Sequence, residues 1–195
     1  MVGSPFLEED RTVGCRRHIA LLRGINVGRA RRLAMADLRA VVAGLGHAEV
    51  RTVLASGNVM FVADGDRECD EMAAGLHGAL VREKGIDADV TVLTAVEFDG
   101  VVQANPLLDL VDDPSRLLVA VPSVAAGVHA LAALPGEGWS PDVLAVGPRA
   151  AYVWCPGGIL GSRVLVAVER ALSGAVTSRN WSTVLKLHAL ACPAT

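Results

Sequence analysis

This sequence of 195 residues has few cysteines and few aromatic residues. Its four cysteines show no C-x-x-C spacing, and its five histidines do not pair with one another at helical or zinc-finger intervals. We therefore expect neither a disulfide scaffold nor a metal site. Because only 4% of the residues are aromatic while 52% are hydrophobic, the core of this globular chain must consist mainly of Ala, Val and Leu.

Long apolar runs are also absent. No stretch stays apolar for the ~20 residues that a membrane-spanning helix requires. Residues 1–16, which we treat as an N-terminal extension, lack the cationic start and apolar run of a secretory signal. We therefore expect a cytoplasmic protein that does not enter a membrane.

The first half of the chain alternates apolar strands with amphipathic helices. In 35–46, for example, Leu38, Val41, Val42 and Leu45 are spaced as on one helix face. The pattern predicts strands at 17–25, 50–56, 59–63 and 88–94 and helices at 35–46 and 66–84. This β-α-β-β-α-β order is that of the ferredoxin-like fold. Gly57-Asn58 is expected to form a two-residue type II′ turn.

The second half shows the same order of elements. A helix over 97–103 should end at Asn105-Pro106, because a residue before proline disfavours helical backbone. We place the domain boundary there, giving α+β subdomains over 17–104 and 105–195. The second subdomain is predicted to contain strands at 117–121, 143–146 and 151–155, helices at 124–134 and 162–172, an extended piece at 175–177 and a final helix at 181–191.

Charges are segregated along the chain. Residues 11–39 contain eight arginines and one acid, and 160–195 are also basic, whereas 64–113 contain thirteen acids and three bases. A fold that joined the two basic ends would present a positive face despite the net charge of −3. Arginine binds phosphate or carboxylate bidentately. Scattered surface charge remains the simpler alternative.

One candidate binding segment follows the first strand, where two glycines four residues apart leave backbone amides accessible to an anion. It lacks the Lys-Ser/Thr ending of a P-loop and the G-x-G-x-x-G spacing of a dinucleotide site. A flexible crossover that needs glycine for turning would explain it equally well. The candidate ligand-binding residues here are Arg23, Gly24, Asn26, Gly28, Arg29, Arg31 and Arg32.

A second candidate segment opens the final helix. Ser178 or Asn180 can cap the helix, and we expect Trp181 to anchor it in the core. Arg179 stands just before the helix start, where a cation is unfavourable unless an anion or a carboxylate is close. We therefore add Arg179 and Asn180 to the candidate ligand-binding residues, with an internal Asp or Glu partner as the alternative.

Topology limits how these segments can combine. We expect the Arg23-Gly24 end of the first strand and the Gly57-Asn58 turn to lie at opposite ends of the sheet, about 20 Å apart. One compact site could not use both. Since turn chemistry already explains Ser56-Gly57-Asn58, we expect that motif to be purely structural.

Several short motifs together resemble the bacterial domain-of-unknown-function family 1697. They are Leu21–Gly28, Met35-Ala36-Asp37-Leu38, Thr52, Ser56-Gly57-Asn58-Val59, Asn105-Pro106, Thr177, Arg179-Asn180-Trp181 and Thr183. The resemblance covers residues 17–191 and implies a cytoplasmic α+β protein of two ferredoxin-like subdomains with no assigned activity. The chain departs from the family pattern at Val53 and Leu107, where an aromatic is common, and this weakens any mechanism based on base stacking there.

Three classes of function stay open. The first is a module that binds a small phosphate-bearing or other anionic ligand; nucleic acid ranks below it because no RNP-type aromatic strand is present. The second is a hydrolase or transferase using Asn26, Ser56, Arg179 and Asn180, although no nucleophile–base or paired-carboxylate pattern is visible. The third is an interaction or assembly protein. No cofactor and no oligomeric state is indicated.

Overall fold

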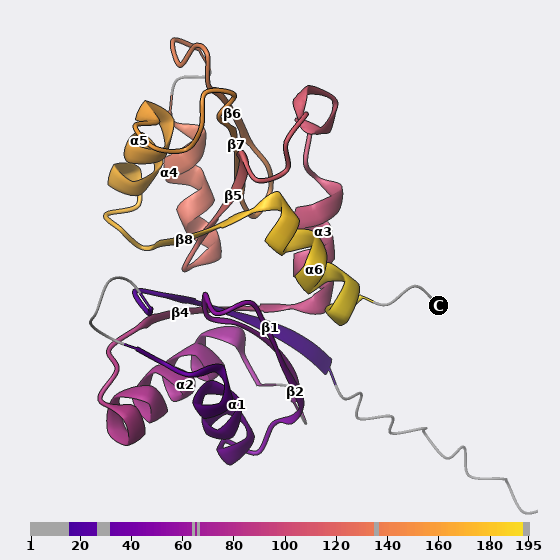
Figure 1. Ribbon diagram of the computed structural model, residues 1–195, viewed down its shortest axis with the longest axis vertical. Coiled ribbons are helices and arrows are strands. Elements are labelled where there is room, and N and C mark those ends of the chain that lie inside the picture. Colours follow the sequence, from indigo (N-terminus) through magenta and orange to yellow (C-terminus); the bar gives the residue numbers. More distant parts are fainter. Residues whose placement is uncertain (1–15, 27–31, 64, 66, 135–136, 193–195) are drawn as a thin grey trace, which may run out of the picture.

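The computed structural model describes residues 16–26, 32–63, 65, 67–134 and 137–192. Two α+β subdomains lie one above the other, with two helices packed between their sheets (Figure 1). In the described part of the chain, no helix is both long enough and apolar enough to cross a bilayer.

The first subdomain is a four-stranded antiparallel sheet in the order β2-β3-β1-β4, covered on its outer face by α1 and α2 (Figure 1). Its own core lies between this face and the two helices and contains Leu38, Leu76 and Leu80. Its elements are β1 Arg16–Arg23, α1 Met35–Gly44, β2 Ala48–Val53, β3 Asn58–Ala63, α2 Cys69–Lys84 and β4 Asp89–Thr94.

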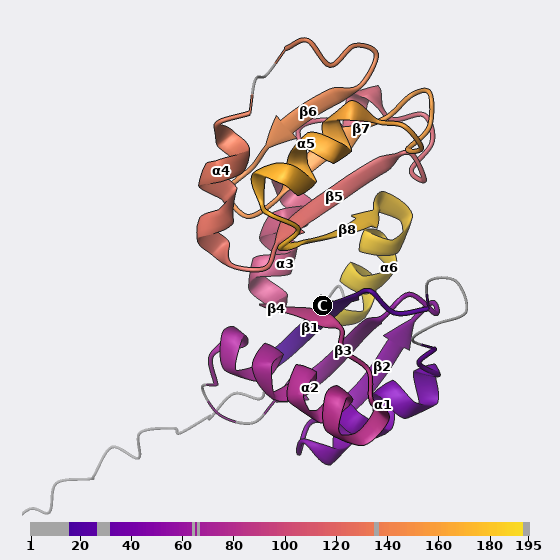
Figure 2. The ribbon, with the colours of Figure 1, turned by 90° about the vertical axis from the view of Figure 1, so that its left-hand side faces the viewer.

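The second subdomain repeats this topology with the strand order β6-β7-β5-β8, also antiparallel. Figure 2 shows α4 and α5 in front of this sheet. Where one helix was predicted over 124–134, a 3-10 turn precedes a shorter α-helix. The elements are β5 Leu117–Pro122, η2 Ala125–Gly127, α4 Val128–Ala132, β6 Val143–Val146, β7 Ala151–Trp154, α5 Arg163–Ala171 and β8 Val176–Asn180.

The two sheets share a third core, here called the central core. It is built around α3 (Ala95–Gln103) and α6 (Trp181–Ala191), which lie between the inner faces of both sheets; a short 3-10 turn, η1 (Leu108–Leu110), follows α3. Trp181 is buried there, as predicted. The buried Tyr152 hydroxyl donates to the carbonyl oxygen of Val101, at 2.6 Å, and so joins β7 to α3. The predicted fold of two ferredoxin-like subdomains plus a C-terminal helix is confirmed.

The hairpin between β2 and β3 differs from the prediction. A four-residue loop over 54–57 replaces the two-residue turn, and Asn58 is already the first residue of β3. The reason lies in Leu54 and Gly57, which adopt φ values of +57° and +75°, so the chain reverses before Asn58. A Cβ on Gly57 would lie 2.7 Å from Leu22 Cβ, so glycine is needed there for space as well as for φ.

The expected separation of β1's end from this hairpin is wrong. Because β1 and β3 are antiparallel, the last residues of β1 lie beside the first residues of β3. Leu21 faces Asn58 in the register, and the Leu22 amide donates to the Gly57 carbonyl oxygen at 2.8 Å. The two motifs that were expected about 20 Å apart therefore meet at one end of the sheet.

Candidate functional site

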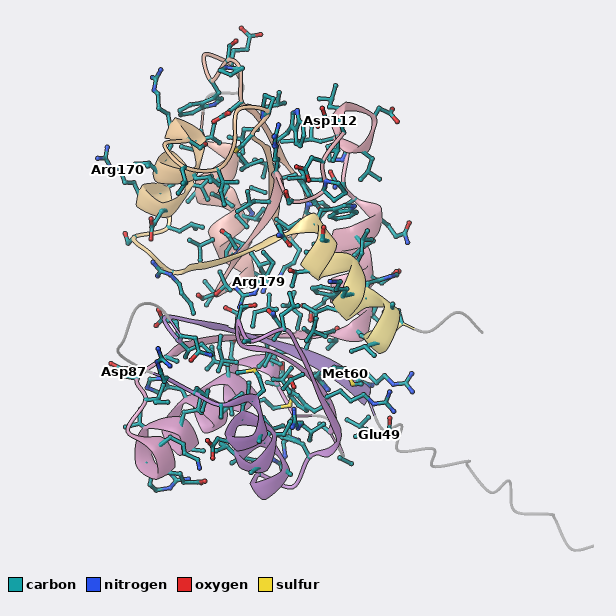
Figure 3. The ribbon with its side chains drawn as sticks, in the orientation of Figure 1. Glu49, Met60, Asp87, Asp112, Arg170 and Arg179 are labelled. Atoms are coloured by element: carbon teal, nitrogen blue, oxygen red, sulfur yellow. The ribbon has the colours of Figure 1, made fainter. Side chains whose placement is uncertain are left out.

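Arg179 joins the two subdomains at this end of the first sheet (Figure 3). It extends from β8 and places its guanidinium against the first subdomain, where Nε donates to Asn58 Oδ1. Nη2 donates to the carbonyl oxygens of Leu22, at 2.6 Å, and Ser56, at 3.0 Å. Burial lowers the pKa of Arg179 to about 10. Its partners are neutral oxygens, not the anion or carboxylate that the sequence led us to expect.

Asn58 completes this contact from the other side. Its side chain is buried, and Nδ2 donates to the Val53 carbonyl oxygen at 3.0 Å and to Ser56 Oγ at 2.9 Å. These two bonds hold the loop closed and leave Oδ1 directed toward Arg179. Ser56-Gly57-Asn58 therefore provides hydrogen-bond acceptors for Arg179 and also connects β2 to β3.

Arg23 forms a second link between the subdomains. Its Nη2 donates to Glu169 Oε1 at 2.5 Å, and its Nη1 donates to the Gly174 carbonyl oxygen and lies 3.7 Å from Asp89 Oδ2. A cavity of about 360 Å³ lies beside Arg23 and Arg179 and is otherwise lined mainly by apolar side chains. Both arginines at this cavity already have internal acceptors.

Asn26 closes the loop that follows β1. It adopts φ +56°, and its side-chain amide donates to the carbonyl oxygens of Ala55, at 2.7 Å, and Leu33, at 3.0 Å. Its Oδ1 accepts the Leu33 amide at 2.8 Å. These bonds give Asn26 a structural function, and Gly24 supports the same turn with φ +82°.

Of the remaining predicted site residues, the structure describes only Arg32 and Asn180. Asn180 caps α6, since its Oδ1 accepts hydrogen bonds from the Thr183 amide, at 3.0 Å, and from the Thr183 hydroxyl, at 2.7 Å. Arg32 is exposed. Gly28, Arg29 and Arg31 lie outside the described residues, so the predicted common positive face is not established.

A second cavity, with a volume of about 580 Å³, lies at the other end of β1, again between the subdomains. The first subdomain contributes the start of β1, the segment before α2 and the end of β4, and the second contributes the turn between β6 and β7. Its lining residues are Arg16, His18, Gly65, Arg67, Glu68, Cys69, Asp70, Val92, Thr94, Glu97, Ala125 and Arg149. No sequence motif links these residues, because only the packing of the subdomains brings them together.

Arg149 is the unusual group in this cavity, here called the Arg149 cavity. Its Nη1 donates to the Pro122 carbonyl oxygen at 2.9 Å, which fixes the side chain. Its Nε is buried and has no hydrogen-bond partner among the described residues. Burial lowers the pKa of Arg149, an effect that the nearby Glu97 carboxylate opposes. A half-buried guanidinium with an unsatisfied donor is costly unless an acceptor is supplied.

Glu97 does not supply that acceptor by hydrogen bonding. Its carboxylate accepts the Thr94 amide at 2.8 Å and the Thr94 hydroxyl at 3.0 Å, and the Glu97 amide donates back to Thr94 Oγ1. This capping box fixes the start of α3. The Glu97 carboxylate at the cavity wall therefore stabilises the start of α3.

His18 and Cys69 add little charge to the cavity at neutral pH. Burial lowers the pKa of His18, and its ring stacks on Phe61 with centroids 5.7 Å apart. Burial and the charge of Glu97 raise the pKa of Cys69 to about 11. Since the thiolate and not the thiol is the nucleophile, this geometry does not activate Cys69. The cavity is therefore suited to binding through arginine.

Comparison with known proteins supports the fold and leaves the activity open. The structure of the conserved bacterial protein SP0830 from Streptococcus pneumoniae is similar to this one, with a TM-score of 0.67 at 19% sequence identity over 91% of this chain and 99% of that one. No match is found among curated proteins. Residues 15–152 match the family described as "Protein of unknown function (DUF1697)". The chain therefore belongs to this family, as its motifs indicated.

Proposed function

We propose that this protein binds a small anionic ligand, a phosphate or carboxylate compound, in the Arg149 cavity. The observation that carries the proposal is the buried Nε of Arg149, which has no acceptor among the described residues. A phosphate or carboxylate in the cavity would offset the burial of this positive charge. Arg16 and Arg67 line the same cavity and can neutralise a second charge on the ligand.

The lining favours a small molecule over a nucleic acid. A volume of about 580 Å³ falls within the usual range of small-molecule sites, ~300–1,000 Å³. Glu68, Asp70 and Glu97 also line the cavity, and they would repel a polyanion while accepting hydrogen bonds from hydroxyl or amino groups of a metabolite. Among the described residues, no Phe, Tyr or Trp lines it to stack on bases, as single-strand binding would require.

This location differs from the arginine-rich segment that the sequence suggested. The cavity beside Arg23 and Arg179 is the competing site, but both of its arginines already donate to protein oxygens. An anion there would have to displace existing bonds, whereas an anion at Arg149 would offset the cost of a half-buried charge. We also place the protein in the cytoplasm, a proposal supported by Cys69, Cys155 and Cys192, which form no disulfide.

The test is calorimetric titration of the purified chain with inorganic phosphate, pyrophosphate, citrate and a panel of sugar phosphates. Arg149→Met should weaken binding at least tenfold, since a charge-assisted hydrogen bond contributes about 1.5–3 kcal/mol. The exposed Arg170→Met removes the same charge from α5 and should leave the Kd unchanged.

A third variant locates the site. If the anion bound beside Arg179, Arg23→Met would weaken binding and Arg149→Met would not. That result would move the site to the other end of β1. Absence of binding to every compound in the panel would refute the proposed function.

A further inference from the structure

Three side chains of different chemistry meet where α3 packs against α6. Asp99 comes from α3 and His188 from the last turn of α6, and Cys192 is the C-cap residue that follows α6. One ligand atom from each of the three lies within 4.8 Å of the other two. All three side chains are half-buried.

The secondary structure explains why these atoms converge. His188 and Cys192 are four residues apart, so they project from the same side of α6, and that side packs on α3. The capping box of Thr94 and Glu97 fixes α3, and the Asn180 cap with the buried Trp181 fixes α6. Neither His–His nor Cys–Cys spacing predicts this group, because it mixes residue types from two helices.

We propose that Asp99, His188 and Cys192 form a binding site for a divalent transition-metal ion, with zinc as the best match. Thiolate, imidazole and carboxylate are the three side-chain ligands that zinc accepts, whereas magnesium and calcium prefer oxygen alone. Three protein ligands leave the fourth tetrahedral position to water. This site is independent of the anion proposed at Arg149.

The distances are close to those that the ion requires. Tetrahedral zinc with bonds of about 2.0–2.3 Å places its ligand atoms about 3.3–3.8 Å apart. His188 Nε2 and Asp99 Oδ1 are 2.7 Å apart, and Cys192 Sγ, which donates to the Ala95 carbonyl oxygen at 3.4 Å, lies within 4.8 Å of both. Rotation of side chains suffices for a change of this size.

Binding moves protons in a defined way. The ion takes the position of the hydrogen that His188 Nε2 shares with Asp99, so a neutral His188 carries its proton on Nδ1 in the bound state. The Cys192 thiol gives up its proton to solvent and binds as thiolate. Gln103 Nε2, 3.4 Å from Asp99 Oδ1, can hold the carboxylate from outside.

Cobalt(II) is the probe, because cobalt bound by a thiolate gives a sulfur-to-metal charge-transfer band and tetrahedral cobalt gives intense visible bands. The full chain should bind one cobalt ion with both features, and zinc should displace it. Cys192→Ser should abolish the charge-transfer band, and His188→Gln should weaken binding at least tenfold. Cys69→Ser, which removes a thiol from the Arg149 cavity, should change neither.

Circular dichroism of each variant separates loss of metal from loss of fold. If His188→Gln unfolds the chain, Asp99→Asn supplies the second ligand test. The proposal is overturned if excess cobalt gives no charge-transfer band with the reduced wild-type chain. It is equally overturned if the band survives in Cys192→Ser, since another thiol would then hold the ion.

Discussion

Replacing Arg179 by methionine should destabilise the protein by about 2–4 kcal/mol. The substitution keeps most of the apolar stem and removes the charged donors to Leu22, Ser56 and Asn58. Hydrogen bonds from a charged group contribute about 1.5–3 kcal/mol each. Against this, burial lowers the pKa of Arg179 to about 10, which corresponds to a desolvation cost of about 3 kcal/mol. The bonds outweigh that cost.

Urea unfolding followed by tryptophan fluorescence measures the effect. Trp154 and Trp181 both lie in the central core, so the signal reports on contact between the subdomains. Arg170→Met is the matched control and should change the free energy of unfolding by less than about 0.5 kcal/mol, because that side chain is exposed. Arg179→Lys should fall between the two, since one ammonium group cannot replace both Nε and Nη2.

The slope of the unfolding curve carries a second readout. If Arg179 couples the subdomains, its loss should lower the m-value or split the transition, because one subdomain can then unfold before the other. An Arg179→Met protein that matches Arg170→Met in both midpoint and slope would refute this reasoning. It would mean that water satisfies the three oxygens as well as the guanidinium does.

Three further predictions concern the core, the hairpin and pH. Trp181→Ala should cost about 3–5 kcal/mol in thermal or urea unfolding, and a loss below 1 kcal/mol would contradict its place in the central core. Gly57→Ala should cost clearly more than Gly46→Ala, because both have positive φ but only the former places a Cβ 2.7 Å from Leu22. His18 has a folded pKa below 6.5, so its contribution to stability is present above pH 6.5 and is lost as the pH falls toward the folded value. His18→Phe should make the urea midpoint depend less on pH in that range. If the pH dependence is unchanged, His18 is not the group responsible for it.

The fold was predictable because hydrophobic periodicity and turn residues mark each element locally. The spacing of Leu38, Val41 and Val42 is enough to indicate α1, and Asn105-Pro106 marks the end of α3. Element boundaries were less predictable. The β2–β3 loop depends on Leu54 adopting positive φ, which leucine rarely does, so tertiary packing and not local preference determines the turn.

The site was less predictable than the fold, because it depends on how two sheets face each other. Arg179 and Asn58 are 121 residues apart, and no local signal indicates that one donates to the other. In the predicted ferredoxin-like fold, the antiparallel pairing of β1 with β3 already places Arg23 beside the hairpin, so the expected separation of about 20 Å did not follow from that fold. Arg149 lies between the strands predicted at 143–146 and 151–155, and the sequence there gives no sign of a binding role.

The two ends of β1 show that the role of an arginine depends on the acceptors its guanidinium finds and not on the sequence motif around it. At one end Arg179 has its donors met by protein oxygens, so its charge stabilises the contact between subdomains. At the other end Arg149 has a buried Nε with no acceptor in the described structure, so its charge opposes folding.

Replacement by methionine should therefore change the stability of the protein in opposite directions at the two positions. Without ligand, Arg149→Met should leave the melting temperature unchanged or raise it, while Arg179→Met lowers it. With an anion at a hundredfold of the wild-type Kd, the wild type and Arg179→Met should be stabilised by about 2.7 kcal/mol, and Arg149→Met by about 1.4 kcal/mol or less. If Arg149→Met is instead as destabilising as Arg179→Met, Arg149 is a structural residue and the anion site is not where we place it.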